Sequence, residues 1–472
     1  MKLKKFMALT MAAVLTMSFA GCGGGDDTTT TQNNNNTTTN QTGKTDDSKD
    51  ATTALKYTDI VLGETETDIE ATIKVLSHRT DLEDNKFPEY IAAFNEMYPN
   101  ITVDYETITD YQEQALLRIE QDDWDIMMIP AVNKSDLPTY FVPFGTLEEL
   151  DTEIRFANTW LNGEQVYGVP STGNAQGIVY NKAVFEAAGV TELPKTPDEF
   201  INALKAIDEK TDAIPLYTNY AAGWTMGGQW DAYIGGSSNG DATFLNQKML
   251  HAQDPFGKEG DVTGPYAVYK ILYDAVANGL TEEDYTTTDW EGSKGMINSG
   301  EIATMVLGSW AFTQMVDAGP NGDDIGYMPF PITIDGKQYA SAGADYSYGI
   351  NVQASEENQQ AAMIYVKWLT ECSGFAYSEG GIPIDVNGEY PALYSAFDGI
   401  EFVASEAALA GEEDLMNQLN EESELMVNAG GDRKVQEIVE HAANGDMSYA
   451  DIMASWNEAW SNAQSTLGVE IQ

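Results

Sequence analysis

Cysteine, histidine and basic side chains are all scarce in this chain of 472 residues. It contains two cysteines and three histidines, and 24 lysines and arginines stand against 75 aspartates and glutamates. Two cysteines give no disulfide framework, so the fold must rely on its hydrophobic cores. The histidines, at positions 78, 251 and 441, lack the spacing of metal ligands. We therefore expect neither a metal nor a cofactor.

The shortage of basic residues leaves a formal net charge of -51. The electric field of so acidic a molecule repels nucleic acid and anionic lipid headgroups, so we expect no nucleic-acid partner. The charge also has a simpler consequence, because it keeps an exported protein soluble.

Long apolar runs are absent except at the start of the chain. Lys2, Lys4 and Lys5 precede an apolar run from Phe6 to Ala20, which is the layout of a secretory signal peptide. About fifteen apolar residues fall short of the roughly twenty that a membrane-spanning helix needs. The sequence therefore predicts an exported protein whose signal peptide covers residues 1–21.

Small residues stand just before Cys22, at Ala20 and Gly21, and they resemble the lipobox of bacterial lipoproteins. This resemblance implies that Cys22 is acylated and becomes the mature N-terminus. It also implies a location on the outer face of the cytoplasmic membrane of a Gram-positive bacterium, with the lipid as the only membrane contact. Cys372, left without a partner in an apolar stretch, is expected to be a small buried side chain.

The segment after Cys22 contains almost no large apolar side chain up to about Lys56. Thr, Asn, Asp, Gly, Gln and Ser cannot bury enough surface to offset the entropy lost on ordering. We therefore expect a disordered tether over residues 22–69, with the folded body beginning near Glu70.

Strand and helix patterns alternate from residue 70 onward. Strands are predicted at 71–76, 101–105 and 125–129, with helices at 87–98 and 111–121 between them. This alternation is typical of a parallel sheet covered by helices on both faces, with ligands at the carboxyl ends of the strands.

A second unit of the same class is predicted after residue 170. A strand at 177–180 leads into a helix that ends at Gly189, and Thr196 to Glu199 form a capping box before the next helix and a strand at 214–217. About 400 residues exceed what one core usually serves, so we expect two lobes. Further helices are predicted at 265–278, 309–317, 356–370, 432–443 and 448–467.

The segment 167–181, YGVPSTGNAQGIVYN, resembles the extracellular solute-binding proteins of ATP-binding-cassette importers. The likeness is to the sugar-binding family that includes maltose-binding protein, and it covers residues 70–472. Other segments agree with the family in order: 76–82, 125–130, 194–207, 300–310, 325–331 and 448–460.

This resemblance implies an α/β, two-lobed periplasmic-binding-protein-like fold of type II, in which each lobe is a sheet covered by helices. The N-terminal lobe would comprise 70–172 plus 340–372, and the C-terminal lobe 173–339 plus 373–472. Such lobes are joined by hinge segments and close over the ligand between them. The hinges are expected near 171–173, 335–337 and 372–374.

Sugars present apolar faces as well as hydroxyls, so a sugar site needs aromatic platforms beside planar polar groups. Trp310 follows Gly308 and Ser309 at the start of a predicted helix, where the family places an aromatic ring in the cleft. Trp224 and Trp230 flank a glycine-rich stretch, which favours a site. The alternative for Trp310 is a core position, and for the other two it is to pin their loop.

Polar candidates follow strand ends. His78, Arg79 and Asp81 come after the first strand, although Arg79 and Asp81 are also compatible with an ordinary surface pair. Asn174 occupies the crossing point at which maltose-binding protein presents a carboxylate, and this departure argues against maltose itself. The remaining candidates are Asp345 and Tyr346, after the second crossing, and Asp110 and Tyr111, which open the second predicted helix.

Two catalytic motifs are missing: the sequence contains no GxxxxGK[ST] and no HExxH. The leading interpretation is a monomeric, lipid-anchored binding protein that hands a small neutral sugar or oligosaccharide to the permease subunits of an importer. One alternative keeps the fold but binds a cationic solute such as a polyamine at Asp81, Asp110 and Asp345. The other is a surface glycosidase, which needs only two carboxylates, or an adhesin.

Overall fold

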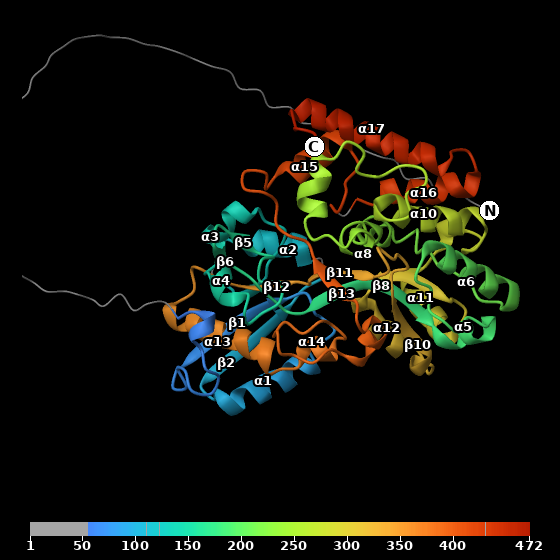
Figure 1. The fold of residues 1–472 in the computed structure, drawn as a ribbon. Helices are drawn as coiled ribbons and strands as arrows, with labels where there is room; N and C mark the ends of the chain where they lie inside the picture. Colours follow the sequence, from blue (N-terminus) through green and yellow to red (C-terminus); the bar gives the residue numbers. More distant parts are fainter. Residues whose placement is uncertain (1–54, 110, 122, 430) are drawn as a thin grey trace, which may run out of the picture. The chain divides into compact units, whose positions relative to one another are not determined.

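The computed structural model describes residues 55–109, 111–121, 123–429 and 431–472 (Figure 1). The predicted signal peptide, the lipidated Cys22, the tether up to residue 54 and the candidate Asp110 lie outside the described residues. Within those residues, no helix has the length and apolar character needed to cross a membrane.

The first sheet has the strand order β2-β1-β3-β12-β7. Its strands are β1 (Ala71–Ser77), β2 (Ile101–Thr107), β3 (Ile126–Met128), β7 (Val169–Pro170) and β12 (Ser347–Ile350). The first three run parallel, as the sequence predicts, whereas β12 pairs antiparallel with both β3 and β7. A strand from far along the chain therefore completes this sheet.

Helices α1 (Lys86–Met97), α2 (Tyr111–Arg118) and α13 (Glu356–Glu371) cover the first sheet and build its core. Phe94 of α1 is fully buried and lies edge-on to Trp368 of α13, with ring centroids 5.5 Å apart. The helical spacing of apolar residues thus marks the faces that pack together.

The folded body begins before Glu70, in contrast to the predicted boundary. Tyr57, in a short 3-10 helix (Tyr57–Asp59), is fully buried in the first core beside Phe144. The ammonium of Lys367 lies 4.3 Å from the centre of the Tyr57 ring. Ile60 is buried in the same core, at 3% exposure, so a few apolar side chains anchor this segment.

The second sheet has the order β10-β8-β11-β13, and β9 also pairs with β8. Its strands are β8 (Gly173–Asn181), β9 (Thr304–Gly308), β10 (Ile325–Pro329), β11 (Tyr339–Ala344) and β13 (Glu401–Ala404). Every partner of β8 runs antiparallel to it, and only β11 and β13 are parallel. The expectation of a second parallel unit is therefore wrong, because long-range strands pair with β8 instead of its neighbours in sequence.

One core of the second lobe is built from helices. They are α5 (Lys182–Ala188), α6 (Pro197–Lys210), α10 (Gly264–Ala277), α16 (Arg433–Asn444) and α17 (Tyr449–Leu467). Figure 1 shows α10, α16 and α17 grouped together. The other core includes residues of β8, β9 and β10. The predicted helices at these positions are confirmed, whereas the segment predicted as a strand at 214–217 makes only isolated bridges.

The remaining elements are short. They are β4 (Gly145–Thr146), β5 (Leu161–Asn162), β6 (Gln165–Val166), α3 (Leu137–Tyr140), α4 (Leu147–Leu150), α7 (Gly227–Asp231), α8 (Gly236–Asn239), α9 (Met249–His251), α11 (Trp290–Ser299), α12 (Phe312–Asp317), α14 (Phe375–Ser378) and α15 (Leu415–Ser423), with 3-10 turns at Lys134–Asp136, Gly223–Thr225, Tyr285–Thr287, Ser309–Ala311, Gly322–Asp324 and Ala392–Phe397 and a π-turn at Phe244–Lys248.

The chain crosses between the sheets at two points that strand pairing identifies. The first lies between β7 and β8, where the sequence predicted it. The second lies between β11 and β12, at Asp345 and Tyr346, because residues 339–344 still pair within the second sheet. The predicted crossing at 335–337 is instead a turn closed by a hydrogen bond from the Lys337 N–H to the Ile334 carbonyl.

The third crossing also lies later than predicted. Phe375 and Ile384 belong to the core of the first sheet, whereas Ile382 packs in a core of the second. Ile382 and Gly173 exchange two backbone hydrogen bonds of 2.6 and 2.9 Å, so this crossing lies against the first one. Cys372 is exposed rather than buried, because it follows the last buried turn of α13 and caps its end.

Candidate functional site

Asn174 and Asp345, both predicted as site residues, meet where the chain passes between the two sheets, at the start of β8 and the end of β11. The Asn174 amide of β8 donates to Asp345 over 3.2 Å, and the other oxygen of Asp345 accepts the Tyr346 N–H over 2.8 Å. The Asn174 carbonyl oxygen accepts the Ser309 hydroxyl over 3.3 Å. Antiparallel pairing of β8 with β11 brings these residues together from positions 171 apart in sequence.

An aromatic stack lies on the first-lobe side of this crossing. The His78 ring stacks on Tyr346 with centroids 4.1 Å apart, and Tyr111 stands edge-on to both at 5.9 and 5.8 Å. The Tyr111 hydroxyl donates to the Met128 carbonyl over 2.7 Å, so it positions the stack from within the core. Three predicted residues from three separate segments thus form one surface.

His78 is held neutral. Burial, together with the positive charge of Arg79, lowers its pKa to about 4, although Asp345 acts in the opposite direction. Its Nδ1 atom is buried and has no partner among the described residues. A neutral imidazole with an unsatisfied nitrogen can exchange a hydrogen bond with a sugar hydroxyl without adding charge to the site.

Arg79 and Asp81 form an ion pair with each other. Arg79 donates from Nε and a terminal nitrogen to both oxygens of Asp81, over 2.8 and 2.7 Å, and contacts Glu379 at 2.6 Å. Burial opposes the charge of Arg79, but the two carboxylates raise its pKa, and Arg79 in turn lowers the pKa of Asp81. The pair therefore ties the loop after β1 to the segment after α14, close to the third crossing.

Three tryptophans cluster in the second lobe. Trp224 lies 5.1 Å from Trp290 and 5.7 Å from Trp310, and the latter two rings are 5.8 Å apart. Trp224 is 46% exposed, which is unusual for the largest apolar side chain. The exposed indole of Trp224, packed against two partly buried ones, offers flat apolar surface to a ligand. Below, the three residues are called the indole cluster.

Trp290 was not found by sequence reasoning, since it lies 20 residues before Trp310 with only a helix start at Asp289 to mark it. Trp230 is different from the cluster, because it is 2% exposed and packs edge-on against Phe330. This burial favours the alternative role of Trp230, which is to pin its loop, and its contact with a ligand stays a prediction.

Three glutamines were also missed. Gln229 accepts the Gly308 N–H over 3.0 Å, and Gln176 has a buried Oε1 atom without a partner among the described residues. Gln112 donates to the Tyr346 hydroxyl over 2.9 Å. For Gln176 a signal existed, because side chains two residues apart on a strand share a face and Asn174 was already a candidate.

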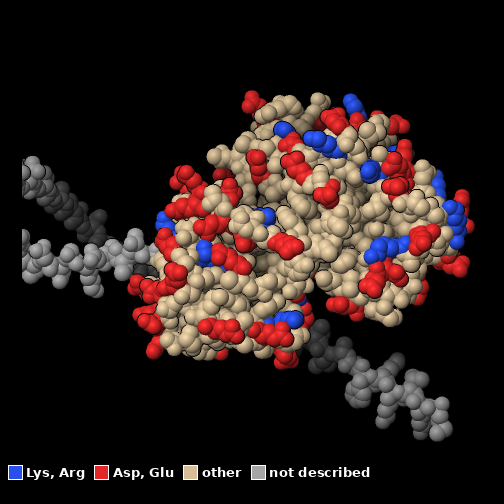
Figure 2. Space-filling view, turned by 60° about the horizontal axis from the view of Figure 1, so that its bottom comes forward, with Lys and Arg blue, Asp and Glu red and all other residues tan. Residues whose placement is uncertain are grey.

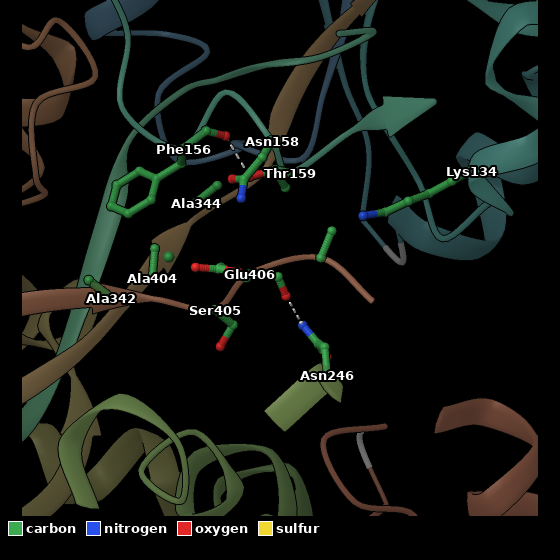
Figure 3. Close-up of a pocket in the computed structure, with 12 residues that line it drawn as sticks. Lys134, Phe156, Asn158, Thr159, Asn246, Ala342, Ala344, Ala404, Ser405 and Glu406 are labelled. Carbon is green, nitrogen blue, oxygen red and sulfur yellow. Dashed lines mark hydrogen bonds between the residues drawn. The ribbon is translucent and has the colours of Figure 1, made fainter. Parts of the chain in front are cut away.

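A hollow of about 230 Å³ adjoins the crossing. Its floor is residues 342–344 of β11, directly before Asp345, and Figure 3 shows polar side chains around it. None of the predicted contacts lines it. The polar lining residues come from both lobes: Lys134, Asn158, Thr159, Asn246, Ser405 and Glu406.

Lys134 is the basic residue that lines this hollow. The residue as a whole is exposed at the rim, yet Figure 3 shows its ammonium end directed inward. Desolvation lowers its pKa, and no carboxylate among the described residues offsets this.

Figure 2 shows acidic side chains spread over a face that is hollowed near its centre. Within the described residues, no group of three or more His, Cys, Asp or Glu could hold a metal ion.

Comparison with known proteins identifies a family pattern over most of the folded body. A model described as bacterial extracellular solute-binding protein matches residues 80–371. The multiple sugar-binding protein of Streptococcus mutans is 27% identical over 242 residues, which are 49% of this chain and 54% of that protein. The chain thus spans about half the length of that relative.

The matches to solved structures cover a larger share of this chain. A manno-oligosaccharide-specific solute-binding protein of Bifidobacterium animalis subsp. lactis, in complex with mannotriose, is 51% identical, with a TM-score of 0.80 over 87% of this chain and 99% of that chain. A binding protein of an ABC transporter from the same organism, in complex with mannobiose, is 52% identical, with a TM-score of 0.80 over 88% and 99%.

Proposed function

Because the chain belongs to the family of bacterial extracellular solute-binding proteins, we propose that it captures a neutral oligosaccharide, of the manno-oligosaccharide class, for an ABC importer. The observation that carries this proposal is the indole cluster, with Trp224 46% exposed, in a chain 51% identical to a manno-oligosaccharide-binding protein. Permease subunits of the importer are the partner.

The site offers the two kinds of contact that a pyranose needs. The indole cluster supplies apolar faces for the C–H side of the ring. The unpartnered Gln176 Oε1 and His78 Nδ1 atoms are available to hydroxyl groups, and their present lack of partners is costly when buried. A sugar that satisfies both atoms gains affinity by removing that cost.

The carboxylates argue against a cationic cargo. Asp81 is neutralised by Arg79, and both oxygens of Asp345 already accept hydrogen bonds from Asn174 and the Tyr346 N–H. A polyamine needs carboxylates that are not already paired with a cation, and Asp81 is paired with Arg79. Of the other two carboxylates in this alternative, Asp345 is held by neutral donors and Asp110 lies outside the described residues. We also propose that the protein has no catalytic activity, because its relatives are sugar-binding transport proteins.

The hollow beside the crossing extends the proposed site. It follows the central residues along β11, where each residue adds about 3.3 Å, so it is placed to hold a further sugar unit. Lys134, Asn158 and Thr159 would reach this unit from one lobe, and Asn246 and Ser405 from the other. A ligand held from both sides favours the closed arrangement of the lobes.

The anchor completes the proposal. An acylated Cys22 would hold the protein, as a monomer, on the outer face of the membrane of a Gram-positive bacterium, with residues 22 to about 56 as the tether. Mass spectrometry of the membrane-bound protein tests this, because acylation adds a fixed mass to a peptide that begins at Cys22. Recovery of an unmodified N-terminus in the culture medium would contradict the anchor.

Titration calorimetry tests the cargo directly. We expect heat of binding with mannobiose and mannotriose, and none with spermidine. Maltotriose is the stereochemical control, since it has the same size and differs in hydroxyl orientation and linkage. Tight binding of spermidine, with no response to any oligosaccharide, would overturn the proposal.

A further inference from the structure

A buried ion pair lies next to the segment that carries Trp224 of the indole cluster. The Lys434 ammonium of α16 is 2.5 Å from an oxygen of Asp231, at the end of α7, and both side chains are at most 3% exposed. The Tyr269 hydroxyl donates to the same carboxylate over 2.6 Å. Burying two charges is costly even when they are paired, so stability alone is a weak explanation for them.

The second oxygen of Asp231 holds a strained loop. It accepts the Asn428 N–H over 2.8 Å, and Glu424, Met426 and Asn428 all have positive φ angles, of 59°, 50° and 51°. Non-glycine residues rarely adopt this conformation, because their side chains are strained in it. Asn420 fixes the same loop by exchanging hydrogen bonds of 2.7 and 2.8 Å with the Val427 backbone.

This loop leads to the point where the backbone contacts the Trp224 segment. A Cβ atom at Gly227 would lie 1.7 Å from the Gly431 carbonyl oxygen, and one at Gly223 would lie 1.6 Å from an Asp432 carboxylate oxygen. These glycines flank the turn that presents Trp224, and Gln229 follows two residues later. The contact is closer than any side chain permits.

We propose that the Asp231–Lys434 pair and the Glu424–Asn428 loop are positioning residues, which hold the Trp224 segment in the geometry that the sugar requires. Strain in the loop and burial of the charges are then the cost of a preorganised platform. This inference rests on the proposed function, because it takes the indole cluster as the sugar platform. None of these positioning residues needs to contact the sugar.

Two neighbouring glycines give a matched test. Gly227→Ala adds a methyl group where Gly431 leaves no room, whereas Gly228→Ala adds one into open space on the same short helix. We expect Gly227→Ala to weaken mannotriose binding by about tenfold or more, since preorganisation sets much of the affinity of such a site. Gly228→Ala should bind as the parent protein does.

A second readout separates positioning from a general loss of structure. Indole rings 5 to 6 Å apart couple optically, so the near-ultraviolet circular dichroism of the ligand-free protein reports the geometry of the cluster. Gly227→Ala should change this spectrum at temperatures well below its unfolding midpoint, and Gly228→Ala should not. An unchanged spectrum together with an unchanged Kd for Gly227→Ala would overturn the inference.

Tyr269→Phe is the variant to use if Gly227→Ala does not fold. It removes one hydrogen bond to Asp231 and leaves the ring in place, so we expect a smaller change of the same kind, about threefold in Kd. No change in Kd or spectrum would again overturn the inference. If the parent protein itself fails to bind mannotriose, the proposed cargo is wrong, whereas the spectra still test whether these residues position the cluster.

Discussion

Single residues show most clearly how burial decides a role. Trp224 and Trp230 stand six positions apart and are equally attractive in the sequence, yet one is 46% exposed and the other 2%. The exposed indole has surface to give to a ligand, whereas the buried one already stabilises a core. The first two predictions belong to this scale.

Trp224→Ala should weaken the binding free energy for mannotriose by about 1–3 kcal/mol, and so raise the Kd, because it removes the most exposed ring of the indole cluster. The unfolding midpoint should change little, since an exposed side chain contributes little to the core. Titration calorimetry and thermal unfolding measure the two effects. Tyr377→Ala is the control, as Tyr377 is also an exposed aromatic residue, at 50%, and lies outside the site. Equal effects on Kd from both variants would contradict the platform role.

His78 predicts a dependence of stability on pH. Its pKa is about 4 in the folded protein, because burial disfavours the charged ring, against 6.5 for an unperturbed histidine. Between these values the unfolded chain binds more protons, so the stabilising contribution of His78 is complete above pH 6.5 and declines as the pH falls toward 4. Urea unfolding at pH 7 and pH 4.5 should show that His78→Gln loses less stability than the parent, by on the order of 1–3 kcal/mol.

His441→Gln is the matched control for this experiment. His441 accepts or donates one hydrogen bond with Asp446 near the surface, and it has a partner that His78 lacks. This control shows how replacing a histidine near the surface affects stability over the same pH range. If His78→Gln follows the parent, the histidine is not held neutral by burial.

Helices and strands differ in how far the local sequence pattern predicts them. The helices α10 and α16 begin and end within one residue of their predicted bounds, because capping residues and apolar spacing are local signals. Thr196 accepts the Glu199 N–H as predicted, although the Glu199 side chain accepts from Lys195 rather than from Thr196. The pairing of β8 was not predictable in this way, since strand partners come from anywhere in the chain.

Gly343→Ala tests the hollow from the strand that forms its floor. A Cβ atom at Gly343 meets nothing within 4 Å, so the fold and its unfolding midpoint should be unaffected. The added methyl group would occupy space that we assign to a further sugar unit, so mannotriose should bind several-fold more weakly. Mannobiose, which needs fewer subsites, should lose less. Equal losses for both sugars would place the third unit elsewhere.

At the scale of the whole molecule, the three crossings decide how the lobes can move relative to each other. They lie around Gly173, at Asp345 and Tyr346, and within residues 382–394. The first and third are joined by backbone hydrogen bonds, and Asn174 links the first to the second. We expect rotation at these crossings to bring the indole cluster toward the aromatic stack of His78, Tyr111 and Tyr346.

Small-angle scattering should therefore detect closure. We expect saturating mannotriose to lower the radius of gyration, because a ligand that contacts both lobes favours the closed state. Spermidine at the same concentration is the control for non-specific charge effects on so acidic a protein. Superimposable curves with and without mannotriose, at concentrations where calorimetry shows binding, would contradict closure.

The sequence by itself determined the family, the two-lobed α/β class and most helices, because those signals lie within short windows. Only the tertiary structure decided that Trp290 joins Trp224 and Trp310, that Trp230 is core, and that Lys134 lines a hollow. It also showed that two crossings lie later in the chain than predicted and that Tyr57 belongs to the first core. These facts depend on contacts between residues tens to hundreds of positions apart, which strand pairing and packing select and local composition does not encode.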